Sequence, residues 1–176
     1  MGSVALPGLS PKHEPEPLDH LVSTTRWHQS EAVDESADRP AGHPNGYLLA
    51  AGRGLPAEDP STKATAASTG GSLTLIESHI QGGPPRHVHT HEDESFYVLD
   101  GSLTVYCGDE IFEAGPRDFV FLPRGVPHHF TTDSRPATVL LLVTPGGIEA
   151  YFREINQARD QATQQQVSIK YGIHQV

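Results

Sequence analysis

The chain has 176 residues, 36% of them hydrophobic, a formal net charge of −10 and one cysteine. This length allows one domain with a real core and one long appendage. The negative charge argues against a nucleic-acid partner, because the phosphates would be repelled, and a lone cysteine, Cys107, excludes an intrachain disulfide.

Residues 1–45 are rich in proline and acidic residues, a composition that disfavours regular structure. They predict an extended arm, which is either mobile or wrapped around the barrel or a second subunit. We expect wrapping, because the only tryptophan, Trp27, is a poor candidate for full exposure to water. The other expected anchors are apolar residues of the same segment: Leu18, Leu21 and Val22.

Targeting and membrane signals are not evident in the sequence. The first residues have no basic start followed by an apolar run, so we expect no signal peptide. The longest strongly apolar run, Val139 to Val143, is far too short to span a bilayer. We therefore expect a cytoplasmic protein without a membrane partner.

The central part of the chain predicts many short strands. Residues 47–51 are interpreted as a first strand, and residues 52–71 as a loop near the mouth of a pocket. From Ser72 onward apolar residues alternate and turn formers separate the runs, which predicts an all-β sandwich or barrel. The expected strands include residues 73–80, 87–89, 95–99, 103–107, 111–113, 119–122, 128–131 and 138–143.

The C-terminal part predicts a helix. Ile148, Tyr151, Phe152 and Ile155 recur at three- and four-residue steps, as one apolar helix face requires. This helix is expected on the outside of the barrel. The tail at residues 161–176 stays ambiguous, because it begins like a helix and ends with strand-like alternation. The expected organisation is an arm at 1–45, a barrel at 46–147, and a helix and tail at 148–176.

Residues 82–101 carry the densest chemistry of the chain. His87 and His89 are two residues apart on an expected strand, so both imidazoles point to the same side. Glu94 begins the next strand, and His128 follows a Pro- and Gly-rich turn. Three imidazoles and one carboxylate suit one divalent first-row metal with positions left open for water or substrate.

These spacings resemble the two motifs of the cupin family. The first motif is matched by His87-X-His89, four residues, Glu94, six residues and Gly101. The second is matched by Pro123-X-Gly-X-X-His128, after residues 119–122. The resemblance extends loosely from Tyr47 to Ile155, and within the family it is closest to the single-domain cupins related to quercetin dioxygenase. It implies a double-stranded β-helix, or jelly-roll barrel, with His87, His89, Glu94 and His128 as metal ligands.

Two positions depart from the family pattern. Arg117 stands where a glycine usually opens the second motif, and Thr132 stands where asparagine is frequent. Neither change removes a ligand. Arginine adopts positive φ less readily than glycine, so the turn at Arg117 is open to question.

Strand parity suggests further residues around the site. His91 is interpreted as solvated, as an outer group that contacts a ligand or relays a proton, or as a replacement for His87 or His89 as ligand. Phe96 and Val98 share the parity of Glu94, and Phe130 shares that of His128. Together with Val105 they are candidates for an apolar pocket wall, with ordinary barrel core as the alternative. Tyr97 is expected to face outward.

The resemblance implies a metal-dependent dioxygenase that cleaves a flavonol or another enolic or polyphenolic compound with O₂ and, for a flavonol, releases carbon monoxide. Glu94 would be both a labile ligand and the catalytic base. The alternatives are a non-oxidative cyclase or isomerase, and a non-catalytic cupin that binds a metal or a small molecule. Iron, manganese, nickel, cobalt, copper and zinc all suit the ligand set. Edge strands and a long arm predict a homodimer.

Overall fold

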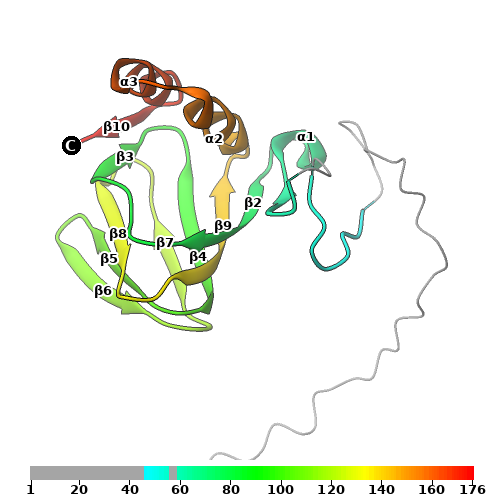
Figure 1. Ribbon diagram of the computed structural model, residues 1–176, viewed down its shortest axis with the longest axis horizontal. Coiled ribbons are helices and arrows are strands. Elements are labelled where there is room, and N and C mark those ends of the chain that lie inside the picture. The colour runs from blue at the N-terminus through cyan, green and yellow to red at the C-terminus, as the bar shows by residue number, and fades with distance from the viewer. Residues whose placement is uncertain (1–45, 56–58) are drawn as a thin grey trace, which may run out of the picture. The chain divides into compact units, whose positions relative to one another are not determined.

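The computed structural model describes residues 46–55 and 59–176. The arm expected at residues 1–45, with its anchors, lies outside these ranges. Within them the alternating runs form strands, and turn-forming residues separate them (Figure 1). The strands are β1 (Thr62–Ala64), β2 (Thr74–Ile80), β3 (His87–His89), β4 (Asp93–Asp100), β5 (Leu103–Cys107), β6 (Glu110–Ala114), β7 (Phe119–Leu122), β8 (His128–Thr132), β9 (Ala137–Thr144) and β10 (Ile173–Gln175).

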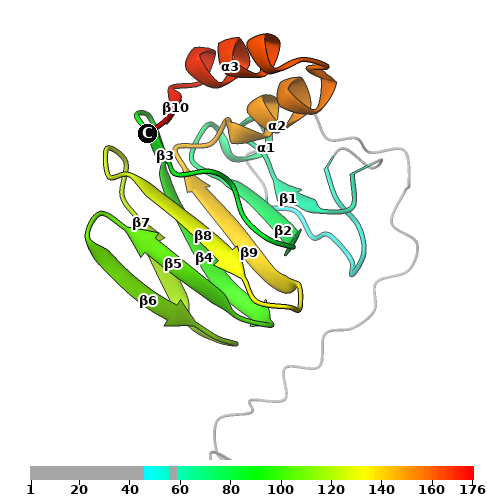
Figure 2. The same cartoon turned by 60° about the vertical axis from the view of Figure 1, so that its left-hand side comes forward.

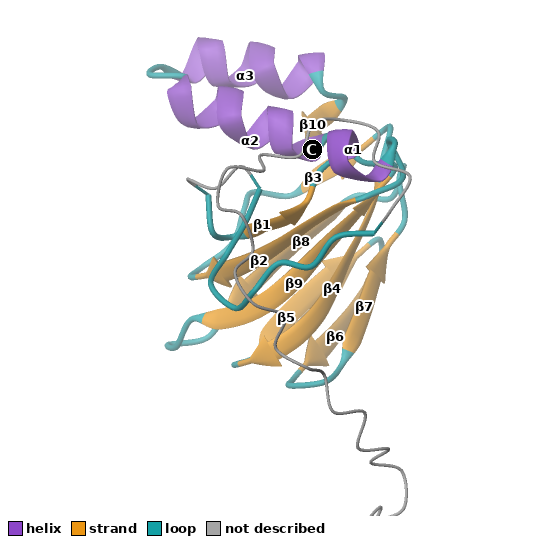
Figure 3. Cartoon of the chain, turned by 90° about the vertical axis from the view of Figure 1, so that its right-hand side faces the viewer, coloured by secondary structure: helices purple, strands orange, loops and turns teal. Residues whose placement is uncertain are grey.

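The strands form two antiparallel sheets of five strands each. One sheet has the order β1-β2-β9-β4-β7 and the other β10-β3-β8-β5-β6. Consecutive strands therefore alternate between the sheets in several places, for example from β3 to β4 and from β7 to β8. Figure 3 shows the strands layered side by side. This arrangement confirms the predicted all-β jelly roll.

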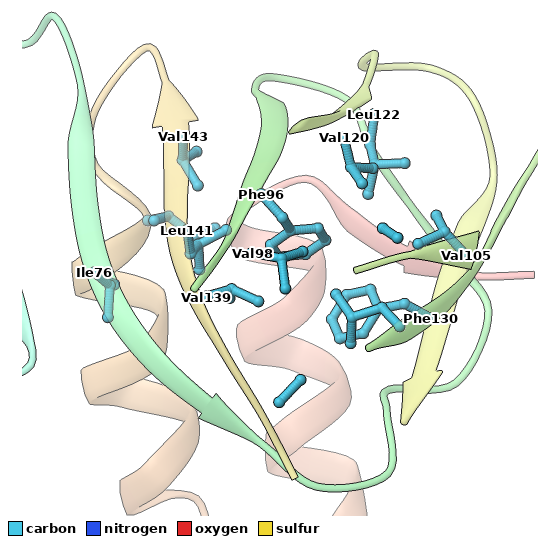
Figure 4. Close-up of a cluster of buried hydrophobic side chains, with 14 of the residues drawn as sticks. Ile76, Phe96, Val98, Val105, Val120, Leu122, Phe130, Val139, Leu141 and Val143 are labelled. Carbon is cyan, nitrogen blue, oxygen red and sulfur yellow. The ribbon is translucent and has the colours of Figure 1, made fainter. Parts of the chain in front are cut away.

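The core lies between the sheets because several strands, β9 most regularly, bury every second residue. On β9, for example, Ala137, Val139, Leu141 and Val143 are buried, whereas the residues between them are partly exposed. Side chains from the two sheets meet in the middle, and Figure 4 shows Phe96 beside Phe130. The two rings pack edge to face with their centroids 4.8 Å apart.

The first strand is not where the sequence suggested. Residues 47–51 have no regular structure, and Leu48 is 88% exposed. The strand that pairs with β2 is β1, which lies in the expected loop and is followed by the short helix α1 (Ala66–Thr69). The Asp59 carboxylate accepts hydrogen bonds from Ser61 and Thr62 and thereby holds the start of β1. The segment that pairs with β2 is thus one whose start is held by local side-chain hydrogen bonds.

The C-terminal part forms two helices and a strand. The expected helix is α2 (Ile148–Gln157), and the ambiguous tail divides into α3 (Gln161–Lys170) and β10. Asp160 caps α3 by accepting a hydrogen bond from the Thr163 amide at 2.8 Å. Figure 2 shows α2 and α3 together at one end of the strands, beside β3 and β10. No described helix is long and apolar enough to cross a membrane.

Candidate metal centre

Two strands of one sheet and one strand of the other bring the candidate ligands together. His87 and His89 lie on β3, and His128 begins the neighbouring β8, where it is paired with His87. Glu94 comes from β4 of the opposite sheet. One ligand atom from each of these residues lies within 4.8 Å of all the others. The site therefore spans the two sheets at one end of the sandwich.

The chain before β3 must pass close to β8 to reach this position. A Cβ atom on Gly83 would lie 1.6 Å from the Phe130 carbonyl oxygen, so no residue with a side chain fits there without a shift of the backbone. The glycine at position 83 is thus explained by the close approach of the two backbones. That approach places His87 opposite His128.

The donor atoms of the four side chains converge on one point. The Nε2 atoms of His87 and His89 are 3.2 Å apart, and His128 Nε2 is 3.2 Å from Glu94 Oε2. His128 Nε2 and Glu94 Oε2 are buried and have no hydrogen-bond partner. Donors bound to one ion at about 2.0–2.1 Å would be separated by roughly this distance. The four side chains therefore fit a single divalent transition metal.

Burial and charge act in opposite directions on two of the histidines. Burial lowers the pKa of His87, which favours its neutral, ligating form. Burial also acts to lower the pKa of His128, but the Glu94 carboxylate and the Val126 carbonyl outweigh it, so the pKa of His128 is raised. Of these two residues, His128 is the one at which a proton competes more strongly with a metal.

Backbone carbonyls orient two of the imidazoles. His87 Nδ1 lies 2.9 Å from the Pro85 oxygen, and His128 Nδ1 lies 2.9 Å from the Val126 oxygen. When Nδ1 donates to these carbonyls, the lone pair of Nε2 points toward the cluster. His89 has no such carbonyl partner, and its Nδ1 faces the buried Glu92 carboxylate at 3.6 Å. Glu92 is not among the residues that the sequence suggested for this site.

A cavity of about 300 Å³ adjoins the cluster. His87, His89 and Glu94 line it, and so do Phe96 and Phe130. His128 is fully buried beneath these residues. The volume is at the lower end of the range for ligand pockets.

The other pocket candidates lie elsewhere. Val98 and Val105 are fully buried in the core and do not line the cavity. Val98 shares the parity of Glu94, but β4 continues past Glu94 into the middle of the sandwich, so the shared parity did not place Val98 in the pocket. His91 is exposed and outside the cluster, because β3 ends at His89 and its side-chain alternation ends there too. The structure therefore does not place His91 where it could replace His87 or His89 as a ligand.

The far wall of the cavity comes from the C-terminal elements. Its residues are Ile148, Tyr151 and Phe152 on α2, Ser168 on α3, and Ile173 and Gln175 on β10. The sequence predicted the apolar face of α2 but placed it only against the outside of the barrel. Nothing local in the sequence indicated that α3 and β10 return to the site.

Comparison with known proteins agrees with this geometry. Residues 75–144 match the family model of the cupin domain. This part of the chain is therefore similar to the cupin domain. The matched range contains both motifs and all four candidate ligands.

The chain is also similar to characterised proteins. Quercetin 2,3-dioxygenase of Bacillus subtilis (strain 168) is 28% identical over 115 residues, which cover 62% of this chain. The match covers 34% of that enzyme, so the chain spans about a third of the curated relative. Among solved structures, KdgF of Halomonas sp. has a TM-score of 0.45 at 20% identity and covers 51% of this chain and 79% of its own. Streptomyces Pac13, a nucleoside dehydratase, has a TM-score of 0.41 at 21% identity, with coverage of 46% and 65%.

Proposed function

We propose that the protein is a metal-dependent dioxygenase that uses O₂ to cleave an enolic or polyphenolic small molecule such as a flavonol. One observation carries the proposal: the cluster of three histidines and Glu94 opens directly into a cavity with aromatic walls. The 28% identity to a quercetin 2,3-dioxygenase across 115 residues supports it. The substrate would be small and largely apolar, with one acidic hydroxyl at the metal end.

The proposed ligands are His87, His89, His128 and Glu94. A divalent transition metal bound there would act as a Lewis acid toward an enolic or phenolic oxygen and make its hydroxyl more acidic. Glu94 is placed to accept that proton, because its Oε2 atom is buried in the cluster and its side chain lines the cavity. A hydroxyl that enters this space meets a carboxylate whose buried Oε2 atom lies 3.2 Å from His128 Nε2.

The side chains that line the cavity determine which kind of substrate fits there. Phe96 and Phe130 offer ring faces and edges to an aromatic group, with Leu141 and Ile148 beside them. Few polar side chains line the remainder, among them Ser78, Ser168 and Gln175. Such walls favour a flat aromatic compound over a sugar or a charged acid, because they leave polar substituents without partners. They also exclude water from the proton transfer.

The proposal is tested with metal-free protein reloaded separately with iron, manganese, nickel, cobalt, copper or zinc. Oxygen uptake and loss of flavonol absorbance are followed together for quercetin-like compounds. We expect at least one redox-active ion to support oxygen-dependent turnover. Equal turnover under strict anoxia would instead indicate a cyclase or isomerase, and metal-dependent binding without turnover would indicate a binding protein.

A substitution at Glu94 tests its role as base. Glu94→Gln keeps the size of the side chain and one donor oxygen but removes the carboxylate that accepts the proton. We expect turnover to fall by about 10²–10⁴-fold when the two proteins carry the same amount of metal, while the melting temperature of the metal-free protein changes little. The control is Glu113→Gln, because Glu113 is exposed on β6 and bonds only to Thr104 there. Full activity in Glu94→Gln would refute the assignment.

A further inference from the structure

The three candidate histidines are not held in the same way. His87 and His128 each place Nδ1 2.9 Å from the carbonyl oxygen of the residue two positions earlier. His89 Nδ1 is buried and has no hydrogen-bond partner among the described residues. A ring without a partner at Nδ1 is free to carry its proton on either nitrogen. The lone pair of His89 Nε2 is therefore not directed toward the cluster by the backbone.

The Glu92 carboxylate lies opposite this unpartnered nitrogen. Its Oε2 is 3.6 Å from His89 Nδ1, and the two side chains are only 11% and 5% exposed. Glu92 Oε2 likewise has no hydrogen-bond partner in the described part of the chain. Arg124, a cation near Glu92, is bound by Asp93 at 2.8 Å. A buried acceptor and a buried donor thus face each other, slightly farther apart than a hydrogen bond.

The backbone fixes this pair on both sides. The His89 carbonyl accepts the Gly125 amide at 2.7 Å, and the Thr90 amide donates to the Gly172 carbonyl at 2.9 Å. The chain bends after β3 and re-enters a strand at Asp93, so Glu92 is held close to the ring of His89. An approach of about half an ångström would bring the two atoms within hydrogen-bond distance.

We propose that Glu92 is a positioning residue for the metal centre. Its carboxylate accepts the proton of His89 Nδ1, which directs the lone pair of Nε2 toward the same point as that of His87 Nε2, 3.2 Å away. A carboxylate behind a ligating imidazole also makes the imidazole a stronger donor. The proposal rests on the proposed metal site, but it does not depend on which reaction occurs there.

Two variants separate the charge of Glu92 from its packing. Glu92→Gln keeps the shape and an acceptor oxygen, whereas Glu92→Ala removes both, and Glu113→Gln serves as the exposed control. Affinity is measured with zinc and cobalt(II) by chelator competition at constant pH. We expect Glu92→Ala to weaken binding by about 10–100-fold, Glu92→Gln to weaken it less, and the control to match the parent. The visible spectrum of bound cobalt should change in the two Glu92 variants only.

Nitrogen-15 NMR of the metal-free protein reports the tautomers directly. We expect His89 to carry its proton on Nδ1 in the parent and to become a mixture of tautomers in Glu92→Ala. His87 and His128 should not change, because backbone carbonyls hold them. Altered tautomers at all three rings would indicate general disturbance of the site and would overturn the proposal.

The outcomes also distinguish this proposal from the proposed function. A parent protein that binds metal but consumes no O₂ with any substrate refutes the dioxygenase and leaves Glu92 testable by affinity and tautomer. Metal affinity within twofold of the parent in both Glu92 variants refutes the positioning role, whatever the activity. A parent that binds neither zinc nor cobalt refutes both.

Discussion

Arg117 occupies a turn position that usually requires glycine. The turn runs from Gly115 to Asp118 and closes with a hydrogen bond from the Asp118 amide to the Gly115 carbonyl at 3.0 Å. Pro116 stands at its second position, and Arg117 at its third has a φ of 76°, the only positive φ of a non-glycine residue in the described ranges. A type II turn requires this geometry, and a side chain at that position strains the backbone.

Replacing Arg117 by glycine should therefore stabilise the protein. We expect Arg117→Gly to raise the free energy of unfolding by about 1 kcal/mol, because relief of strain exceeds the extra entropy of the unfolded chain. Urea denaturation of the metal-free protein measures the change. Arg135→Gly is the control, since Arg135 has no positive φ and gains nothing from glycine. A loss of stability in Arg117→Gly would contradict this account.

The sequence predicted the residues that converge but not the one behind them. The side-chain period of a strand placed His87 and His89 on one side, and motif spacing indicated Glu94 and His128. Glu92 could not be predicted, because β3 ends at His89 and the position of its carboxylate depends on the bend that follows. Val98 is the opposite case, a residue predicted for the pocket that lies in the core, because strand parity alone does not distinguish a pocket wall from the core.

An ion pair joins the start of β4 to the turn before β8. The Arg124 side chain donates to both carboxylate oxygens of Asp93, at 3.0 and 2.8 Å, and its amide donates at 2.9 Å. Asp93 adjoins Glu94, and Arg124 lies in the turn before His128. These hydrogen bonds lower the pKa of Asp93 to about 2. The pair thus connects the segments that supply two of the candidate ligands.

This pair should make stability depend on pH in a defined range. A carboxyl group whose pKa is lowered by folding stabilises the native state above its ordinary pKa of 3.8, and this contribution is lost as the pH falls through about 2. We expect Asp93→Asn to be less stable than the parent at pH 7, with the difference shrinking between pH 4 and 2. The effect should be modest, because Arg124 is exposed to solvent.

Urea denaturation of the metal-free proteins at several pH values measures this difference. Asp109→Asn, an exposed turn residue, should follow the parent throughout. A gap between Asp93→Asn and the parent that is constant down to pH 2 would mean that the ion pair is not its cause.

At the scale of elements, strands with strict alternation were predicted well and pairings that depend on distant segments were not. The pattern at residues 73–80 and 138–143 gave β2 and β9, which pair along their full length. Residues 47–51 had a suitable composition but form no strand, because β1 is the segment that pairs with the edge of β2. The tail became a strand only at Ile173–Gln175, where β3 offers an open edge.

At the scale of the whole described fold, the C-terminal strand β10 supports β3, the strand that carries two of the candidate metal ligands. β10 pairs with β3 throughout, whereas β8 pairs with β3 only at His87. Hydrogen bonds join Thr90 to Gly172 and Val176 to Arg86. Since bonded pairs alternate in an antiparallel ladder, the pair His174–Val88 between them is also a bonded one. The strand with two candidate ligands is therefore held mainly by residues far along the chain.

Proline at position 174 should loosen this strand. His174→Pro removes an amide donor worth about 1 kcal/mol, so we expect a few-fold loss of metal affinity and a lower melting temperature. His174→Ala keeps the backbone donor and should resemble the parent, because the side chain is exposed. Metal content after dialysis, by elemental analysis, gives the comparison. Equal retention in both variants would show that β10 does not support the site.

The outer face of the sheet carries Tyr97. Tyr97 faces outward as predicted and is 41% exposed, beside Phe119 and Phe121 on β7. The homodimer and the cytoplasmic location stay predictions.

The pairing of β10 with β3 also has a consequence for the order of events during synthesis. The ribosome makes β3 more than eighty residues before β10, so a nascent chain exposes both histidines of β3 while the partner strand is still missing. Contacts over such a separation form late in folding. A metal ion that needs both of these histidines would then bind after β10 has emerged and paired with β3.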